Sequence, residues 1–543
     1  MAPPNMALKD PSGNCTDDPQ RCAELLNKFF QDQFCPGHGI TDLPKLSTDT
    51  DDLEISVEGV KKLIASLANG KSPGPDGIRK PDLLIDIEAV ASCLAIIFRA
   101  SLKTGKLPTQ WKMANVTAVH KGGELDLPNN YRPISLTSIP CKMLEHIVLH
   151  HLNQELDKVL HNRQHGFRQT MSCETQLCAT YNDLAKSAEA TKSTHAVTLD
   201  FKKAFDKVPH DLLMEKVRNI SNLHPILINW IQDFLTNRKQ RVIRKGASSG
   251  ERQVTSGVPQ GSVLGPTLFL IYINDLPTAV SCQVSLYADD TLLYQEVTSE
   301  NDVRTFQSNI DAVHKWSKRW HMPFNETKCQ AMSFGGDDLK PPYRLGDVLL
   351  TWVSETKYLG VTIQSDLKFD KHIAEKTQKA RKILGAIKHT LFDAPKDARL
   401  LAYTSLCRPI LEYADTVWDP TNKQTMHSIE MIQNNAVRYI ERLKGRESVS
   451  EARDRLQLKS LADRRKDHRL SLLFKILEHE DRHSALSSSY DELIGDRAGM
   501  TMTTRAASGN QPTSIFASSQ AYHNSFLPRT IRDLRLSTHR TNE

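Results

Sequence analysis

Three aspartates at the ends of short β-type segments are the feature that most constrains the fold of this chain. The run Val197-Thr-Leu-Asp200 is apolar, ends on an acid and passes into a helical segment. The stretch from Val284 to Tyr294 has apolar residues on both sides of Asp289-Asp290, which is typical of a β-hairpin with two carboxylates at its tip. Acids at strand ends are exposed where ligands bind, so the pattern predicts a sheet with an acidic site.

Repulsion between these carboxylates favours a bound cation. In an effective dielectric of about 20, two like charges in close contact repel by about 4 kcal/mol unless a cation intervenes. A solvated Asp-Asp turn explains most such pairs, but here apolar flanks and a second strand-terminal acid point to a metal site. Oxygen ligands suit Mg²⁺, and two such ions about 4 Å apart would support the in-line displacement that a nucleotide polymerase performs.

The pattern of helices and strands changes along the chain. Between residues 107 and 365, short β-type runs mix with helical segments, which predicts an α/β sheet domain. After about Lys368 helical patterns dominate, and from about Ala485 the chain is rich in Ser and Thr, so we expect loose order there. With 39% hydrophobic residues, 25% charged residues, 26 Pro and 25 Gly in 543, the composition excludes a wholly disordered or fibrous protein.

Charge is unevenly distributed, although the whole chain carries only +6. Residues 1–100 hold 10 Lys and Arg against 15 Asp and Glu, a net charge of −5. Residues 371–480 hold 22 against 15, a net charge of +7. A basic helical segment indicates a polyanionic partner, because Lys and Arg displace the counterions of phosphates, although an ordinary basic surface is the commoner explanation.

No segment of the sequence is typical of a membrane or secreted protein. The most apolar stretch, Leu83 to Phe98, is interrupted by Asp86 and Glu88. The N-terminus lacks a basic start followed by an apolar core, and the ten cysteines are scattered, which suits a reducing compartment. We therefore expect an intracellular protein without a membrane partner.

Six motifs, in the expected order, resemble those of reverse transcriptases. Tyr287-Ala-Asp-Asp290 resembles the catalytic centre of this family, Asp200 to Asp206 its first catalytic block, and Gly257 to Pro266 the block between them. The set is most similar to non-LTR retrotransposons of the jockey type, over about residues 20–530. The other three motifs are Tyr131-Arg-Pro-Ile-Ser-Leu136, Gln164-His-Gly-Phe-Arg168 and Tyr358-Leu-Gly-Val361.

The resemblance implies the fold of a right-hand polymerase. We expect an α/β (α+β) protein with fingers, a palm made of an antiparallel sheet plus helices, and a helical thumb. The expected segments are an N-terminal linker or extension with helices (1–70), fingers with the start of the palm (71–195), the palm with the catalytic aspartates (196–365), a basic helical thumb (366–484) and a Ser/Thr-rich C-terminal tail (485–543).

The same resemblance implies a metal site. Asp200 and Asp289 would be the principal ligands, Asp290 would complete the acidic cluster, and the backbone carbonyl of Phe201 would add an oxygen. Two Mg²⁺ ions are expected, or Mn²⁺ in their place. Lys328 matches a later lysine of the family that could protonate the departing pyrophosphate, although a solvated lysine at a helix end is an equal alternative.

Five further residues are implied to contact the incoming nucleotide. Lys121 and Arg132 match basic residues of the fingers, although each is by default a surface cation. Phe205 stands where the family places an aromatic gate against a ribose 2′-hydroxyl; without the resemblance, a buried core phenylalanine would be as plausible. Gln260 and Gly261 lie in a Gly/Pro-rich loop, where a residue without Cβ permits close backbone approach.

The resulting hypothesis is an RNA-directed DNA polymerase that takes an RNA template, a DNA primer or target and deoxynucleotides. An RNA-dependent RNA polymerase would usually carry a polar residue in place of Phe205. The alternative is a non-enzymatic protein, a decayed or domesticated fragment of such an element that acts as an RNA-binding protein. The protein would work as a ribonucleoprotein in the nucleus or cytoplasm, and a missing domain or another protein would supply the endonuclease of complete elements.

Two motifs of the C-terminal third recur in these elements without a mechanism that we can assign. They are Arg408-Pro-Ile-Leu-Glu-Tyr-Ala-Asp-Thr-Val-Trp418 and Leu527-Pro-Arg-Thr-Ile-Arg532.

Overall fold

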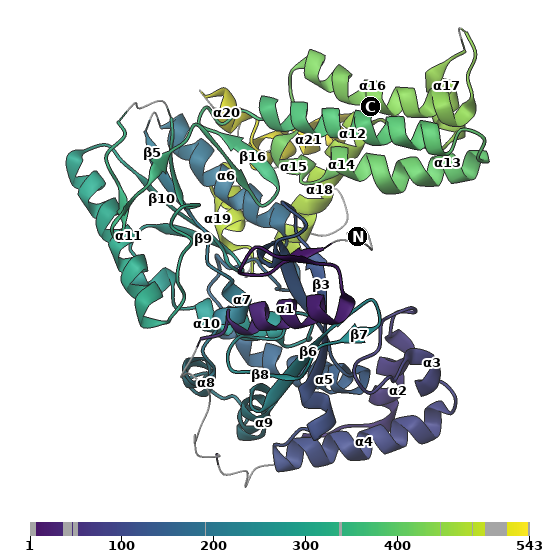
Figure 1. Ribbon diagram of the computed structural model, residues 1–543. Coiled ribbons are helices and arrows are strands. Elements are labelled where there is room, and N and C mark those ends of the chain that lie inside the picture. The colour runs from purple at the N-terminus through teal and green to yellow at the C-terminus, as the bar shows by residue number, and fades with distance from the viewer. Residues whose placement is uncertain are drawn as a thin grey trace. The chain divides into compact units, whose positions relative to one another are not determined.

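The computed structural model describes most of the chain (Figure 1). Its residues fall into two compact units. Unit 1 comprises Met1–His161, Phe201–Ala279 and Ala312–Asn325, and unit 2 comprises Asn162–Asp200, Val280–Asp311 and Glu326–Glu543. The units alternate along the chain, and the division into consecutive fingers, palm and thumb segments stays a prediction. The described residues are 7–35, 46, 53–190, 192–335, 339–445, 447–480, 482–494 and 519–540.

Unit 1 contains a mixed sheet with the strand order β4-β3-β6-β7, in which β8 also pairs with β6. β3 pairs antiparallel with β4 and parallel with β6, while β1 and β2 form a separate hairpin. The strands are β1 (Leu8–Lys9), β2 (Cys15–Thr16), β3 (Met113–His120), β4 (Tyr131–Leu136), β6 (Arg238–Arg244), β7 (Ala247–Ser248) and β8 (Arg252–Val254).

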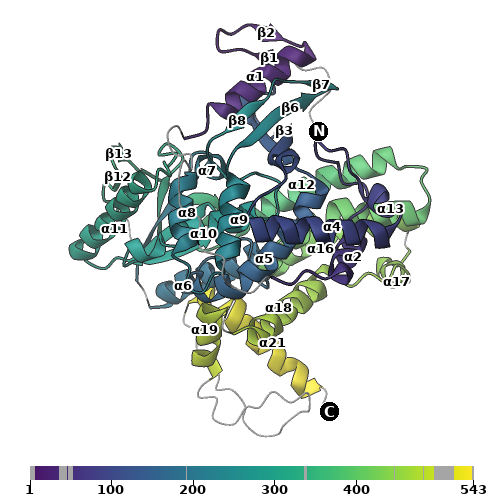
Figure 2. The same ribbon diagram turned by 90° about the horizontal axis from the view of Figure 1, so that it is seen from below.

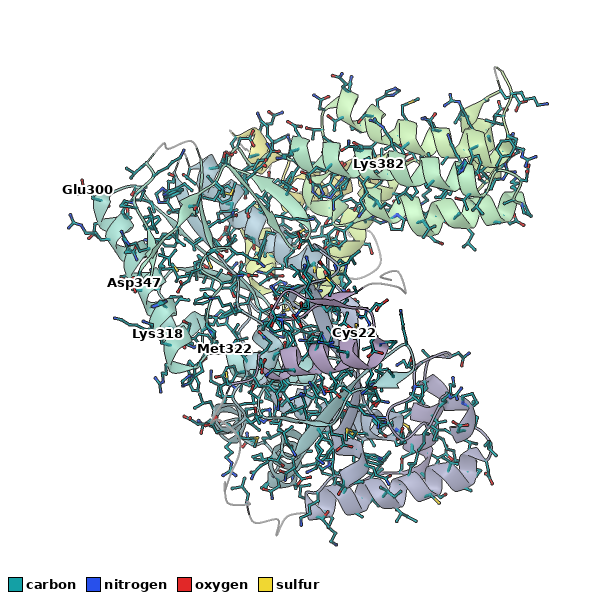
Figure 3. The ribbon with its side chains drawn as sticks, in the orientation of Figure 1. Cys22, Glu300, Lys318, Met322, Asp347 and Lys382 are labelled. Carbon is teal, nitrogen blue, oxygen red and sulfur yellow. The ribbon has the colours of Figure 1, made fainter. Side chains whose placement is uncertain are left out.

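The helices of unit 1 bury their apolar faces. In α1 the Asp18 carboxylate accepts the N–H of Arg21 and caps the helix, which packs Cys22 (labelled in Figure 3) and Phe30 into a core with Val116. The helices are α1 (Pro19–Gln31), α2 (Val57–Ser66), α3 (Lys80–Leu83), α4 (Ile87–Thr104), α5 (Ile139–Val159), α7 (Ala204–Lys207), α8 (His210–Arg218), α9 (Pro225–Leu235) and α10 (Gly265–Ile273), with 3₁₀ turns at Thr109–Lys112, Pro128–Asn130 and Pro277–Ala279.

Unit 2 contains a sheet with the strand order β14-β11-β5-β10-β9. All neighbours pair antiparallel except β11 and β14, and β5 is central and almost fully buried. The hairpins β12–β13 and β15–β16 are separate. The strands are β5 (Thr194–Leu199), β9 (Gln283–Tyr287), β10 (Asp290–Glu296), β11 (Gln330–Phe334), β12 (Arg344–Leu345), β13 (Val348–Leu349), β14 (Thr351–Trp352), β15 (Glu355–Tyr358) and β16 (Val361–Gln364).

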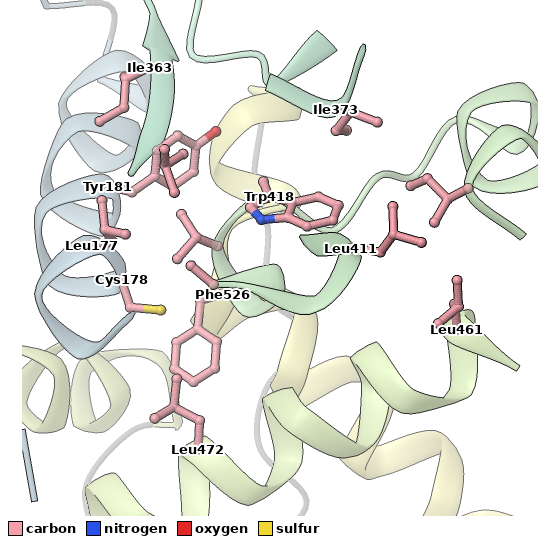
Figure 4. Close-up of a cluster of buried hydrophobic side chains, with 14 of the residues drawn as sticks. Leu177, Cys178, Tyr181, Ile363, Ile373, Leu411, Trp418, Leu461, Leu472 and Phe526 are labelled. Atoms are coloured by element: carbon pink, nitrogen blue, oxygen red, sulfur yellow. The ribbon is translucent and has the colours of Figure 1, made fainter. Parts of the chain in front are cut away.

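Buried residues of α6, the β15–β16 hairpin and the C-terminal helices form a continuous hydrophobic core in unit 2 (Figure 4). α11 (Glu300–Arg319) has residues in both units. The other helices are α6 (Cys173–Glu189), α12 (Asp370–Thr390), α13 (Lys396–Ala402), a π-helical turn (Tyr403–Cys407), α14 (Arg408–Glu412), α15 (Asp415–Trp418), α16 (Lys423–Glu441), α17 (Val449–Arg455), α18 (Leu461–Glu478), α19 (Ser484–Ile494), α20 (Gln520–His523) and α21 (Phe526–Arg540).

The C-terminal segment differs from the loose order expected after Ala485. Residues 484–494 and 519–540 form α19, α20 and α21, and α21 lies beside α18 (Figure 2). Phe526 and Leu527 of α21 are buried in the same core as Trp418. The guanidinium of Arg529 donates to the backbone oxygen of Asp419 at 2.5 Å. Trp418 and Leu527, one from each of the two motifs without a mechanism, therefore belong to the same hydrophobic cluster. Residues 495–518 lie outside the described part of the chain.

The mixture of helices and strands confirms the expected α/β (α+β) class. Among the described residues, no helix combines the length and the apolar character that crossing a bilayer needs.

Candidate active site

Strand pairing in unit 2 brings the three aspartates together. β9 and β10 form a hairpin whose closing pair is Tyr287 and Asp290, so Ala288 and Asp289 make its two-residue turn. β10 also pairs with β5, and Thr291 lies opposite Leu199. Asp290 precedes Thr291 and Asp200 follows Leu199, so the two acids lie at the same end of this antiparallel strand pair. The acids predicted from separate segments therefore share one end of the sheet.

Lys328 lies beside the first of these acids. Its Nζ is 3.7 Å from Oδ2 of Asp200, with 65% of the lysine side chain and 44% of the aspartate side chain exposed. The Asp200 N–H also donates to Sγ of Cys329 at 3.5 Å. An ion pair this exposed contributes little to stability, so the lysine can move without cost to the fold.

The oxygen donors of this site fit Mg²⁺. Within the described ranges, no group of three His, Cys, Asp or Glu side chains is arranged to hold an ion by itself. Mg²⁺ does not need such a cage, because it keeps several waters and usually binds through one or two carboxylates and the phosphates of its substrate. Carboxylates at adjacent strand ends, one of them 44% exposed, leave room for those ligands.

Tyr287 precedes the aspartates and is protonated at neutral pH. Burial, with smaller contributions from Cys173 and the negative charge of Asp290, raises the pKa of the Tyr287 hydroxyl to about 12.

In unit 1, Gln260 and Gly261 are fixed on the edge of β4. The backbone carbonyl of Gln260 accepts the N–H of Ser135 at 2.7 Å. The side-chain Nε2 of Gln260 donates to Oδ1 of Asp206 at 2.8 Å. Gly261 has φ +115°, and a Cβ there would lie 2.5 Å from the Ser135 oxygen. Any other residue would push the loop away from the strand, so the glycine is required at this close approach.

Two buried acids that sequence reasoning missed support the same loop. Asp206 is 8% exposed, and burial raises the pKa of its carboxyl to about 6, against the opposing charges of Lys203 and Lys207. Glu145 is fully buried, and its carboxylate accepts the N–H groups of Val263 at 2.7 Å and Leu264 at 3.0 Å. The sequence pointed to Asp206 only as the last residue of the block that begins at Asp200, and it gave no indication that Glu145 is buried or supports the loop.

The remaining nucleotide-binding candidates also lie in unit 1. The Phe205 ring is half-buried and stacks on Phe269, with centroids 4.6 Å apart and planes at 15°. Arg132 on β4 faces Val119 on β3, and Lys121 follows β3 with its N–H bonded to the Asn130 oxygen at 2.9 Å. Both cationic side chains are exposed near the turn of this hairpin.

The predicted site residues therefore form two groups, each placed within its own unit. Asp200, Asp289, Asp290 and Lys328 belong to unit 2. Lys121, Arg132, Phe201, Phe205, Gln260 and Gly261 belong to unit 1. That both groups act in one site stays a prediction.

The chain is similar in sequence to known RNA-directed DNA polymerases. The chain is 31% identical over 407 residues to the probable RNA-directed DNA polymerase from transposon BS of Drosophila melanogaster, covering 71% of this chain and 44% of the relative. It is 28% identical over 467 residues to the RNA-directed DNA polymerase from mobile element jockey of the same species, covering 80% of this chain and 50% of the relative. It is 27% identical over 400 residues to the probable RNA-directed DNA polymerase from transposon X-element of Drosophila melanogaster, covering 70% of this chain and 43% of the relative. The chain thus spans about half the length of these curated relatives.

Residues 119–363 match the family described as reverse transcriptase (RNA-dependent DNA polymerase). This range contains Asp200, Asp289 and Asp290 together with the loop that carries Gln260. Residues 119–363 therefore belong to the reverse transcriptase family.

Proposed function

We propose that the protein is the RNA-directed DNA polymerase of a non-LTR retrotransposon, which adds deoxynucleotides to a primer 3′-hydroxyl on an RNA template. The observation that carries this proposal is the convergence of Asp200, Asp289 and Asp290 at adjacent strand ends in unit 2. The family match and the relatives of the BS, jockey and X elements support the same activity.

The three carboxylates and the backbone carbonyl of Phe201 would hold two Mg²⁺ ions, or Mn²⁺ in their place. Such ions lower the pKa of the attacking hydroxyl and neutralise the charge on the leaving pyrophosphate. Lys328, whose Nζ is 3.7 Å from Oδ2 of Asp200, would give a proton to that leaving group.

Residues of unit 1 would bind and select the nucleotide. Arg132 can hold the triphosphate with a bidentate fork and Lys121 with a single point charge. Gln260 and Gly261 would contact the nucleotide and template from a loop that Ser135 and Asp206 fix in place. Phe205, supported by Phe269, would exclude a ribose 2′-hydroxyl.

The proposed partners are an RNA template, a DNA primer or target and dNTPs. The net-positive helices of residues 371–480, among them α12 with the exposed Lys382 (Figure 3), would follow the nucleic-acid backbone. We further propose that the protein acts as a ribonucleoprotein in the nucleus or cytoplasm, and that another domain or protein cuts the target.

Primer extension tests the proposed activity. With a poly(rA) template, an oligo(dT) primer and Mg²⁺, the protein is expected to incorporate dTTP and to discriminate against UTP. Electrophoretic separation of a labelled primer measures both. Binding of the RNA without extension in either Mg²⁺ or Mn²⁺ would instead favour the alternative of an RNA-binding fragment.

Phe205→Val is expected to raise the ratio of UTP to dTTP incorporation by about tenfold or more. A hydrophobic pocket distinguishes two substrates that differ by one small group by about 10- to 200-fold, so the removal of the ring should lose discrimination of this order. The measurement is kcat/KM for each nucleotide, and Phe392→Val, at a phenylalanine that is 70% exposed, is the control. An unchanged ratio in an active Phe205→Val enzyme would assign the ring to packing against Phe269 only.

A further inference from the structure

The turn that carries Asp289 has an unfavourable backbone conformation. Ala288, the first of its two residues, has φ +54°. This left-handed region disfavours residues with a Cβ, and alanine offers no side-chain oxygen to compensate. Such conformations persist where surrounding contacts hold them, and they gather at functional sites. The contacts around Ala288 therefore show what keeps Asp289 in place.

Gln164 supplies the principal contact. Its Oε1 accepts the N–H of Ala288 at 2.9 Å and the N–H of Gly166 at 2.8 Å, and the residue is only 1% exposed. Its Nε2 is buried without a hydrogen-bond partner among the described residues. An unpaired buried amide nitrogen is destabilising, so we attribute the presence of Gln164 at this position to the two N–H groups that its oxygen accepts.

The backbone around Gln164 runs along the strand that leads into the turn. The Leu286 N–H donates to the Arg163 oxygen at 3.0 Å, and the His165 N–H donates to the Leu286 oxygen at 3.0 Å. Gln164 and Leu286 thereby form an isolated parallel bridge. The segment is anchored to β9 two residues before Ala288, which fixes the position of the Gln164 side chain.

Gly166 brings this segment into direct contact with the turn. A Cβ at Gly166 would lie 2.4 Å from the Ala288 nitrogen and 3.0 Å from the Tyr287 carbonyl carbon. Both neighbours are backbone atoms, so a side chain here would displace the turn. The glycine is required by this close approach and not by its own φ.

We propose that Gln164 and Gly166 are positioning residues that hold the Ala288–Asp289 turn so that the Asp289 carboxylate can bind a divalent ion. The inference rests on the proposed function. Both residues would act through the backbone of Ala288, which Gln164 binds by a hydrogen bond and Gly166 approaches closely. Groups that orient metal ligands in this way typically change metal affinity or activity by about 10- to 100-fold when they are removed.

The test compares Gln164→Met, which keeps the volume and removes the oxygen, with the parent. Mn²⁺ binding to the full chain is measured from the electron paramagnetic resonance signal of the free ion, and primer extension is titrated with Mg²⁺. We expect the Mn²⁺ dissociation constant and the half-saturating Mg²⁺ concentration to rise about tenfold. Gly166→Ala should shift both in the same direction.

Gln433→Met is the matched control. Gln433 is fully buried in unit 2, accepts the Tyr403 hydroxyl at 3.0 Å and donates to the Lys459 oxygen at 2.9 Å. Its loss should lower stability and leave metal dependence unchanged, because it does not contact the turn.

Three results would overturn the inference: a folded Gln164→Met variant with the parent's ion affinity, a shift equal to that of Gln433→Met, or a failure of both Gln164→Met and Gln164→Asn to fold. A parent protein that neither binds Mn²⁺ nor extends a primer would contradict the proposed function itself, so the two failures are distinguishable.

Discussion

Asp289→Asn is expected to slow RNA-templated primer extension by at least about 1,000-fold while RNA binding and folding stay unchanged. Asparagine keeps the size of the side chain but removes the negative charge from the Ala288–Asp289 turn. A metal-bound ligand set stabilises the transition state by several kcal/mol, and each 1.4 kcal/mol or so changes the rate about tenfold. The measurement is single-turnover extension at saturating dNTP and Mg²⁺, with RNA affinity determined in parallel.

Asp347 offers a matched control for this substitution. It lies in the turn of the β12–β13 hairpin, also in unit 2, where Leu345 and Val348 form the closing pair (Figure 3). Its side chain is exposed. Asp347→Asn should extend primers at the parent rate. If Asp289→Asn does so too, the proposed role of Asp289 in catalysis is wrong.

The acidic residues were predictable because their signal is local. Apolar runs that end on acids are visible in the sequence at Asp200 and at Asp289-Asp290, and the symmetry of the flanking runs predicted a hairpin with both acids at its tip. The structure shifts that turn by one residue, because Ala288 and Asp289 form it and Asp290 begins β10. The register that places Leu199 opposite Thr291 was not predictable. It depends on β5 pairing with β10 on one side and β11 on the other, across long loops that the sequence pattern does not constrain.

The supporting residues were invisible for a different reason. Glu145 occurs in a helix where an acid is ordinarily solvated, and its role arises only because tertiary packing buries it against the N–H groups of Val263 and Leu264. Gln164 belongs to a recognised motif, but its bond to Ala288 joins residues 124 positions apart. Burial and long-range partners decide such roles, and neither leaves a local pattern.

The C-terminal helices show how composition can mislead. Serine and threonine between about Ala485 and the end of the chain suggested loose order, yet Phe526, Leu527 and Ile531 are buried in α21. Composition alone does not register the helical spacing of Leu527, Ile531 and Leu534. Here the helix is stabilised by tertiary contacts, including an ionic network that composition does not reveal.

Asp419 is the centre of that network. Its side chain is 5% exposed and contacts three guanidinium groups, those of Arg465 at 2.5 Å, Arg529 at 2.9 Å and Arg469. Arg469 also pairs with Asp533 of α21. Burial lowers the pKa of Arg469 to about 10, which still leaves its guanidinium charged at neutral pH. One buried carboxylate thus compensates cations from α18 and α21.

Asp419→Ala is therefore expected to lower the local free energy of unfolding by about 3–5 kcal/mol, because it removes the ion-pair partner of Arg465 and Arg529 and leaves Arg469 with Asp533 alone. The surface pair of Asp467 and Lys459 is the control, since its atoms are 2.7 Å apart but its side chains are 50% and 66% exposed. Asp467→Ala should cost about 1 kcal/mol or less.

Hydrogen exchange followed by mass spectrometry resolves the effect, because it reports the opening free energy of each peptide separately. Peptides of α15, α18 and α21 should exchange faster together in Asp419→Ala, since α15 directly precedes Asp419 and the other two helices carry its arginines. Peptides of the β5–β10 pair should be less affected, because their hydrogen bonds lie within the sheet. If exchange in α18 and α21 is no faster than in Asp467→Ala, hydrophobic packing around Trp418 and Phe526 holds the helices without the network.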